Sequence, residues 1–148
     1  MKNLKLLNNV LKKIDESPFI IAEIGQAHDG SLGNALSYID AVADAGANAV
    51  KFQTHFANEE SSKYDDFRVK VFPQDETRHS YWKRMEFSSR DWSKLKEKST
   101  DRGLVFLSSP FSLLAVKVLS NLNIVAWKIA SGELSNYPMI DNILETNR

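Results

Sequence analysis

The sequence contains no cysteine, which excludes several kinds of chemistry at once. Disulfide bonds, thiolate catalysis and zinc sites built on cysteine are all removed, and the redox compartment stays undecided. No apolar run approaches the roughly 20 residues of a membrane-spanning helix. The lysine-rich start at residues 1–18 is interrupted by Asn and Lys and lacks the apolar core of a signal peptide. We therefore expect a cytoplasmic protein.

Neither sign of charge is in excess, because 19 Lys and Arg residues balance 19 Asp and Glu residues. This balance favours neither nucleic acid nor an anionic membrane as a partner, so a bound anion would need a local site. With 148 residues, of which 43% are hydrophobic, the chain has the size and composition of one soluble globular domain.

Four short apolar runs lack clean alternation, which predicts strands buried on both faces, as in a parallel sheet. Each is followed by a segment with helical spacing, and serine or proline stands near the start of several of these segments. The predicted strands cover residues 19–25, 48–53, 104–109 and 124–132, and the predicted helices cover residues 34–47, 88–103, 112–123 and 137–147.

This alternation predicts an α/β fold with parallel strands and right-handed crossovers. Four βα units are half of a TIM (β/α)8 barrel, which needs about 250 residues. A small doubly wound sheet is the alternative, but the first turn has glycines at Gly25, Gly30 and Gly33 and does not match the dinucleotide fingerprint GxGxxG. We expect the barrel, with an N-terminal extension at residues 1–18 and the half barrel at residues 19–148.

A long connection at residues 54–87 separates the second predicted strand from the helix that follows it. Connections of this length in a compact fold are usually functional or disordered. Tyr64, Phe67, Phe72, Tyr81 and Trp82 are scattered through it. Aromatic residues of this kind favour a folded lid over the site, with a structural excursion or an interface as the alternative.

Polar residues recur at the carboxyl ends of all four predicted strands, where ligands meet the sheet in α/β folds. The pattern has three interpretations: opposite charges that neutralise one another, a pocket for a phosphate or carboxylate, or a lysine that forms a Schiff base with a carbonyl substrate. The residues concerned are Glu23, Lys51, Gln53, Ser108, Ser109, Lys128, Ser131 and Glu133.

The three histidines do not share the spacing of a metal site. His28 lies in the polar turn after the first strand, where it could contact a ligand or be an ordinary loop residue. His55 and His79 show no i, i+4 or HxH spacing with it or with each other. We therefore expect no complete metal site in this chain.

Four ordered motifs together resemble the N-terminal barrel motifs of the sialic acid synthase family. They read IAEIGQAHDG, GANAVKFQTH, FLSSPF and WKIASGE, and the resemblance covers residues 19–148. In that family a TIM barrel is followed by a small antifreeze-protein-like domain. The resemblance implies condensation of phosphoenolpyruvate with an N-acylated aminosugar such as N-acetylmannosamine, which releases phosphate and gives a nine-carbon 2-keto acid.

The resemblance also implies roles for individual residues. Lys51, Ser109, Lys128 and Ser131 would hold the phosphate and carboxylate of phosphoenolpyruvate, with Glu23 beside the reacting centre. Gln53 and Glu133 would contact the sugar. Gln26 and Asp29 stand where the family commonly has Asn, and Ser109 replaces the usual Thr while keeping the hydroxyl.

The family pattern continues beyond residue 148, so we expect a truncated half barrel that is inactive alone. The full-length form is expected to be a homodimer that uses a divalent metal, Mn²⁺ or Mg²⁺, whose histidine ligands would lie outside this chain. A Schiff-base aldolase and a non-catalytic half-barrel binding module remain alternatives. Several aminosugars fit, including precursors of sialic, legionaminic or pseudaminic acid and of spore-coat polysaccharide.

Overall fold

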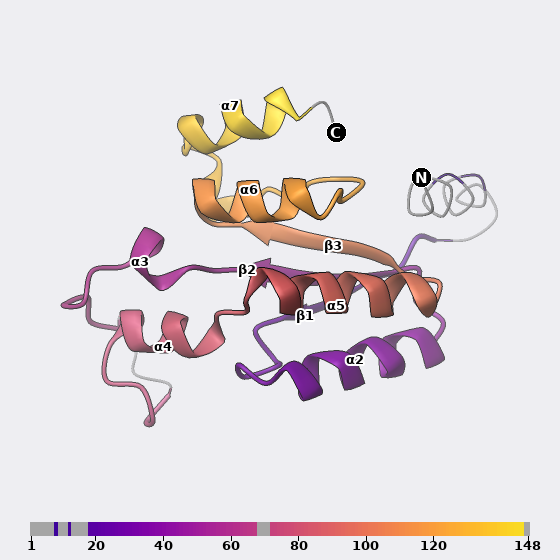
Figure 1. Cartoon of the computed structure of the whole chain (residues 1–148), viewed down its shortest axis with the longest axis horizontal. Helices are drawn as coiled ribbons and strands as arrows, with labels where there is room; N and C mark the ends of the chain where they lie inside the picture. Colours follow the sequence, from indigo (N-terminus) through magenta and orange to yellow (C-terminus); the bar gives the residue numbers. More distant parts are fainter. Residues whose placement is uncertain (1–7, 9–11, 13–17, 68–71, 147–148) are drawn as a thin grey trace.

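The computed structural model describes residues 8, 12, 18–67 and 72–146. Three strands form one parallel sheet in the order β1 (Ile21–Gly25), β2 (Ala49–Thr54) and β3 (Val105–Pro110). Figure 1 shows helices connecting the strands, so that each crossover returns the chain to the same end of the sheet. The parallel pairing and the intervening helices confirm the α/β class expected from the apolar runs.

Four helices lie where helical spacing predicted them: α2 (Leu32–Asp44), α5 (Ser89–Asp101), α6 (Leu113–Asn121) and α7 (Tyr137–Glu145). Ser31, Ser88 and Ser112 each accept a hydrogen bond from a backbone N–H in the first turn of α2, α5 and α6. Such a cap satisfies a donor that the helix itself cannot pair. Pro138 stands in the first turn of α7, and Gly46 follows α2 with a φ of 78°. The local start and stop signals are therefore used as predicted.

The main hydrophobic core lies between one face of the sheet and the helices that cover it. Val50 and Phe52 of β2 and Phe106 of β3 point into this layer, where the rings of Phe52 and Phe106 are 5.9 Å apart. Trp92 of α5 meets both rings edge-on. Because side chains alternate along a strand, the neighbouring residues of β2 point to the opposite face. We call that opposite side the open face, defined by Glu23, Lys51, Gln53, Leu107 and Ser109.

A smaller apolar cluster covers the lower part of the open face. Ala49, Val105 and Leu107 form its buried centre, and Phe19, Val125 and Ala126 pack against them. Beyond this cluster, toward the carboxyl ends of the strands, the open face becomes polar. The open face thus has an apolar part and, toward the carboxyl ends of the strands, a charged part. We call the charged part, which contains Glu23 and Lys51, the charged rim.

The fourth predicted strand, at residues 124–132, is not part of the sheet. Among the described residues this segment pairs with no strand, and its end forms a 3-10 turn, η1 (Ser131–Glu133). Val125 and Ala126 pack on the open face, whereas Trp127 and Ile129 turn toward α6 and α7. Apolar periodicity reports which side chains are buried, and here both sides are, but it does not report whether the backbone pairs with a neighbour.

The connection at residues 54–87, predicted as a lid and called the excursion below, is folded in its described parts, residues 54–67 and 72–87. They contain α3 (Ala57–Glu60) and α4 (Arg78–Met85). The ring of Phe72 stacks on Tyr81 at 4.6 Å, and Phe67 meets Tyr81 edge-on at 6.0 Å. The Glu86 carboxylate accepts a hydrogen bond of 2.6 Å from the backbone N–H of Ala57, which joins the two ends of the excursion. Phe67, Phe72 and Tyr81 therefore form a small aromatic cluster, whereas Tyr64 is exposed.

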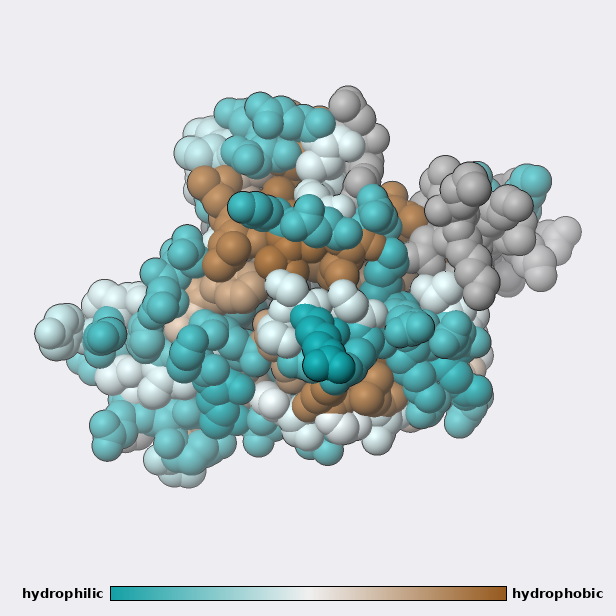
Figure 2. Space-filling view, in the orientation of Figure 1, coloured by the Kyte–Doolittle hydropathy of each residue, from teal (hydrophilic) through white to brown (hydrophobic). Residues whose placement is uncertain are grey.

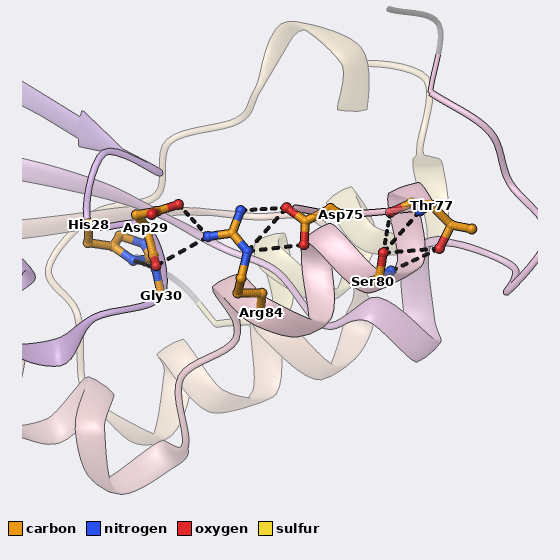
Figure 3. A network of polar contacts seen from close by, with 7 residues as sticks. All are labelled: His28, Asp29, Gly30, Asp75, Thr77, Ser80 and Arg84. Carbon is orange, nitrogen blue, oxygen red and sulfur yellow. Dashed lines mark hydrogen bonds and ion pairs between the residues drawn. The ribbon is translucent and has the colours of Figure 1, made fainter. Parts of the chain in front are cut away.

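Arg84 fastens this excursion to the turn after β1 (Figure 3). Its guanidinium donates hydrogen bonds of 3.0 and 3.1 Å from Nε to the buried carboxylate of Asp75, and it forms an ion pair with Asp29. Hydrogen bonding to Asp75 raises the pKa of Arg84, so the guanidinium stays charged. Gly30 allows the close approach, because a Cβ atom there would overlap the carbonyl oxygen of Arg84. Asp29, which departs from the usual Asn, thus has a partner in the excursion.

Apolar side chains gather over α6 and β3 on the face shown in Figure 2. Leu113 and Leu114 of α6 are 49% and 38% exposed. No helix within the described part of the chain is long and apolar enough to cross a membrane. Most of the predicted N-terminal extension, residues 1–18, lies outside the described residues.

Replacing Gly30 with alanine should release the excursion from the sheet. Gly30 and Gly46 have φ angles of 76° and 78°, but an added Cβ at Gly46 meets nothing within 4 Å. We expect Gly46→Ala to lower the free energy of unfolding by about 1 kcal/mol through backbone strain alone. Gly30→Ala should cost about 3 kcal/mol, because overlap is added to strain. Urea unfolding measures both, and limited proteolysis should cut residues 54–87 faster only in Gly30→Ala; equal losses would contradict the packing described.

Candidate functional site

Opposite charges from two neighbouring strands meet on the open face. Glu23 of β1 and Lys51 of β2 are register partners, and their side chains form an ion pair. The Lys51 side chain is 13% exposed and that of Glu23 is 45% exposed. A carboxylate in an ion pair with a largely buried lysine favours the charged form of the lysine and offsets part of its desolvation. The pair matches the neutralisation predicted for strand ends, but it does not account for the second lysine.

Lys128 brings another positive charge to the same region. Burial lowers the pKa of Lys51, and the charge of Lys128 lowers it further. Lys128 lies on the segment after α6, and its side chain is exposed, with Nζ donating a hydrogen bond of 2.6 Å to the carbonyl oxygen of Ile129. An anion bound near both ammonium groups would offset their mutual repulsion.

Gln53 and Ser109 lie one step farther along the open face, toward the carboxyl ends of the strands. They are register partners across β2 and β3. Behind them, on the covered face, the hydroxyl groups of Thr54 and Ser108 share a buried hydrogen bond of 2.8 Å. This bond ties the two strands together at the level of Gln53 and Ser109. The structure therefore brings Glu23, Lys51, Gln53 and Ser109 onto one face.

Ser131 and Glu133 belong to the 3-10 turn that follows Lys128. Ser131 is exposed, and the Glu133 carboxylate accepts a hydrogen bond of 2.8 Å from the side-chain amide of Asn136. Asn136 caps α7 by accepting a hydrogen bond from the N–H of Met139. Glu133 thus supports the start of α7.

His28 lies in the turn after the first strand, as the sequence indicated, but it is buried. Its side chain has no exposed surface, and its ring centroid is 4.5 Å from that of Phe87. Nδ1 accepts a hydrogen bond of 3.1 Å from the N–H of Gly30, whereas Nε2 has no partner in the described part of the chain. Burial lowers the pKa of His28 to about 4, an effect that Asp29 opposes and His55 strengthens. His28 is a neutral ring that shapes the turn, and its contact with a ligand stays a prediction.

His55 is a residue of the site that sequence reasoning considered only as a metal ligand. It follows β2 directly, and its Nε2 lies 3.2 Å from the side-chain oxygen of Gln53. Its Nδ1 lies 2.6 Å from a carboxylate oxygen of Glu60 in α3. The sequence offered one signal for this role of His55. It stands two residues after Gln53 at the end of a strand, and residues two apart share a face.

The described residues do not form a site for a divalent metal. No group of three or more His, Cys, Asp or Glu side chains gathers within residues 18–67 and 72–146. Both ring nitrogens of His55 have partners, and Nε2 of His79 lies 2.9 Å from the side-chain oxygen of Asn58. His28 is enclosed by aromatic rings. The donors present are therefore engaged elsewhere and do not fit a metal.

A groove between α6 and α7 lies apart from these charges. Its lining comes from those two helices and includes Leu113, Val116 and Asn142. None of the predicted site residues contributes to it. The charged rim of the open face is thus the better candidate for chemistry.

Comparison with known proteins gives a family and several relatives. Residues 38–148 match the model of the NeuB family. The chain is 33% identical over 132 residues to the N,N'-diacetyllegionaminic acid synthase of Campylobacter jejuni, covering 87% of this chain and 40% of that protein. It is 31% identical over 138 residues to the N-acetylneuraminate-9-phosphate synthase of Homo sapiens, covering 88% of this chain and 37% of that protein. The chain thus spans about 40% of the length of the curated relatives that it matches.

Solved structures agree with the fold. The N-acetylneuraminic acid synthetase of Leptospira borgpetersenii, solved in complex with citrate, matches with a TM-score of 0.70 and 30% identity. The match covers 86% of this chain and 41% of that one. Together with the parallel sheet and its helical crossovers, this likeness confirms that the chain folds as part of a TIM barrel.

The buried neutral ring of His28 should make stability depend on pH. Its pKa is about 4 in the folded protein and about 6.5 when unfolded, so between these values the unfolded chain binds more protons. Stability is therefore lost as the pH falls from about 6.5 toward 4. We expect His28→Phe to remove roughly 2 kcal/mol of the loss in unfolding free energy between pH 7 and pH 4.5. Urea unfolding at both pH values measures this.

The matched control is His79→Phe, which changes a histidine that is only partly buried. It should leave the pH dependence of the parent chain unchanged. If His28→Phe shows the same loss of stability as the parent between these pH values, then His28 is protonated in the folded chain and its assigned environment is wrong.

Proposed function

Because the chain belongs to the NeuB family, we propose that it carries the anion-binding part of a synthase that condenses phosphoenolpyruvate with an N-acylated aminosugar. The observation that carries this proposal is the largely buried Lys51 on the open face, next to the register partners Gln53 and Ser109. The lowering of its pKa by burial and by the charge of Lys128 agrees with it. Two like charges held together gain from a ligand with a phosphate and a carboxylate. Phosphoenolpyruvate carries both groups on a single carbon, carbon 2.

The hydroxyl groups of Ser109 and Ser131 complete the proposed clamp. Ser109 lies on the same face as Lys51, and Ser131 follows Lys128 by three residues in the turn η1. Hydroxyl donors add directional hydrogen bonds to the point charges of the two lysines. We assign the clamp to binding and orientation, because a held phosphoenolpyruvate presents its carbon 3 in one direction only.

Glu23 is the proposed group beside the reacting centre. In the proposed reaction, carbon 3 of phosphoenolpyruvate attacks the aldehyde carbon of the open-chain sugar, and positive character develops at carbon 2. Water then adds at carbon 2, and the tetrahedral species expels phosphate. We propose that the Glu23 carboxylate, which is paired with Lys51, stabilises the positive stage and accepts the proton from water. Gln53 and Glu133 are proposed to contact the sugar.

We propose that the choice of sugar, and the binding of any metal, depend on residues other than those described. The relatives bear the names of synthases for several acids, so we propose only the class of an acylated aminosugar. No step of the mechanism is assigned to a metal, since the described donors do not fit one. Because the chain spans about 40% of its relatives, we propose that residues 1–148 alone do not complete the reaction.

A Schiff-base aldolase is the second candidate, and one observation favours it. Burial lowers the pKa of Lys51, and a lysine with a lowered pKa is a better nucleophile toward a carbonyl group. The ion pair with Glu23 acts in the opposite direction, because it holds the nitrogen protonated. We therefore prefer a lysine that binds an anion to one that attacks a carbonyl group.

The proposal is tested by phosphate release in a chimera. Residues 1–148 replace the matching part of the Campylobacter jejuni relative, and release from phosphoenolpyruvate is measured with Mn²⁺, with and without N-acetylmannosamine or a diacetamido-hexose. We expect release only when the aminosugar is present. Lys128→Ala should lower the rate at least 100-fold, because it removes a charge-assisted contact of about 3 kcal/mol, and should leave the circular dichroism spectrum unchanged.

The control is Lys117→Ala, which removes an exposed lysine of α6 far from the charged rim. It should leave the rate unchanged. Full activity of Lys128→Ala, or covalent trapping of a carbonyl substrate on Lys51 or Lys128 by borohydride, would refute the proposed synthase mechanism; the second result would favour the aldolase.

A further inference from the structure

His55 is almost fully buried and lies between two aromatic rings, although it belongs to a connecting segment. Its side chain is 3% exposed. Its ring lies between those of Trp82 and Phe111, with centroid distances of 3.8 and 4.1 Å and interplanar angles of 14° and 19°. Trp82 comes from α4 and Phe111 follows β3. Two distant segments therefore fix the plane of one imidazole ring at the end of β2.

The hydrogen bonds of His55 fix the rotation of the ring within that plane. Glu60 binds Nδ1 at 2.6 Å through one carboxylate oxygen, and its other oxygen accepts a hydrogen bond of 2.7 Å from the N–H of Phe56. The carboxylate is thus anchored at both oxygens. On the other side of the ring, Nε2 faces the side-chain oxygen of Gln53 at 3.2 Å. A carboxylate oxygen and an amide oxygen both accept hydrogen bonds, so these two contacts need a proton on each ring nitrogen of His55. In that form the ring is an ion-pair partner of Glu60, and it donates from Nε2 to the Gln53 oxygen.

The opposite end of the Gln53 amide borders the charged rim. A Cβ atom added at Gly25 would lie 3.4 Å from the amide nitrogen of Gln53 and 3.3 Å from a carboxylate oxygen of Glu23. Both groups therefore approach the same glycine, which has a φ of 53° and no side chain of its own. A side-chain amide has a donor end and an acceptor end. When His55 binds the oxygen, the nitrogen is left to face the Glu23 side.

We propose that His55 is a positioning residue: held by Glu60 and by the rings of Trp82 and Phe111, it orients the Gln53 amide so that its N–H donors face the open face beside Glu23. This inference rests on the proposed function, in which Gln53 contacts the sugar. It also gives the excursion at residues 54–87 a role in the site, because Glu60 and Trp82 come from its two helices. A sugar oxygen is the class of acceptor that the oriented N–H donors fit.

The test follows the Gln53 side chain by nitrogen-15 relaxation in the 148-residue chain. His55→Phe keeps a flat ring between Trp82 and Phe111 but removes both nitrogens. We expect the order parameter of the Gln53 side-chain nitrogen to fall from about 0.8 to below about 0.6. The backbone order parameters of Lys51 and Phe52 should not change, since a role in stability alone would loosen the whole strand end.

Two further variants keep the test decisive. His79→Phe, the matched control in α4, should leave Gln53 as ordered as in the parent. Glu60→Gln keeps the ring and weakens its anchor, so it should lower the Gln53 order parameter by a smaller amount, and it decides the question if His55→Phe does not fold. If Gln53 stays ordered in the folded variants, or if the backbone of β2 loosens to the same extent, the inference is overturned.

Titration with inorganic phosphate separates this inference from the proposed function. The affinity for phosphate should be the same in the parent and in His55→Phe, because the two lysines are unchanged. A parent chain that binds no phosphate would count against the anion clamp, while the order parameter of Gln53 would still report on His55. A tenfold loss of phosphate affinity in His55→Phe would place His55 in the clamp and contradict a role limited to Gln53.

Discussion

The parallel register of the sheet decides where the charged side chains of its strands, Glu23 and Lys51, point. Lys51 pairs with Glu23 on one side and with Leu107 on the other, and Gln53 pairs with Ser109. Because side chains alternate, a shift of one residue would turn Lys51 into the helix-covered core and Phe52 out of it. The burial of Val50, Phe52 and Phe106 prevents that shift. The hydrophobic pattern that builds the core therefore also aims the polar residues at the open face.

Burying a lysine is costly unless its charge is compensated, and Lys51 has both an opposite charge and a like charge near it. Glu23 compensates the charge of Lys51, while Lys128 repels it. A protein selected for stability alone would have little use for the second lysine, since like charges at close range destabilise the fold. The arrangement becomes favourable when an anion enters between them. This balance links the packing of the strands to the binding of phosphoenolpyruvate that we propose.

Local signals were sufficient for the first three strands and for the helices with serine caps, because those signals act within a few residues. They failed at residues 124–132, where alternate side chains are buried without backbone pairing. They did not predict the surroundings of His28 and His55, which come from Phe87, Trp82 and Phe111. Contacts across such separations leave no periodic pattern in the sequence. The resemblance of the four motifs supplied the residues of the rim, but it did not supply the ring sandwich behind them.

The most direct measurement is the pKa of Lys51 with and without phosphoenolpyruvate, followed by the chemical shift of its ε carbon. Burial and the charge of Lys128 hold this pKa below its ordinary value in the chain without ligand. An anion between the two lysines favours their charged forms, so the pKa of Lys51 should rise when phosphoenolpyruvate is added, and it should rise less in Lys128→Ala. A pKa of Lys51 that stays the same with phosphoenolpyruvate in excess would contradict the anion clamp.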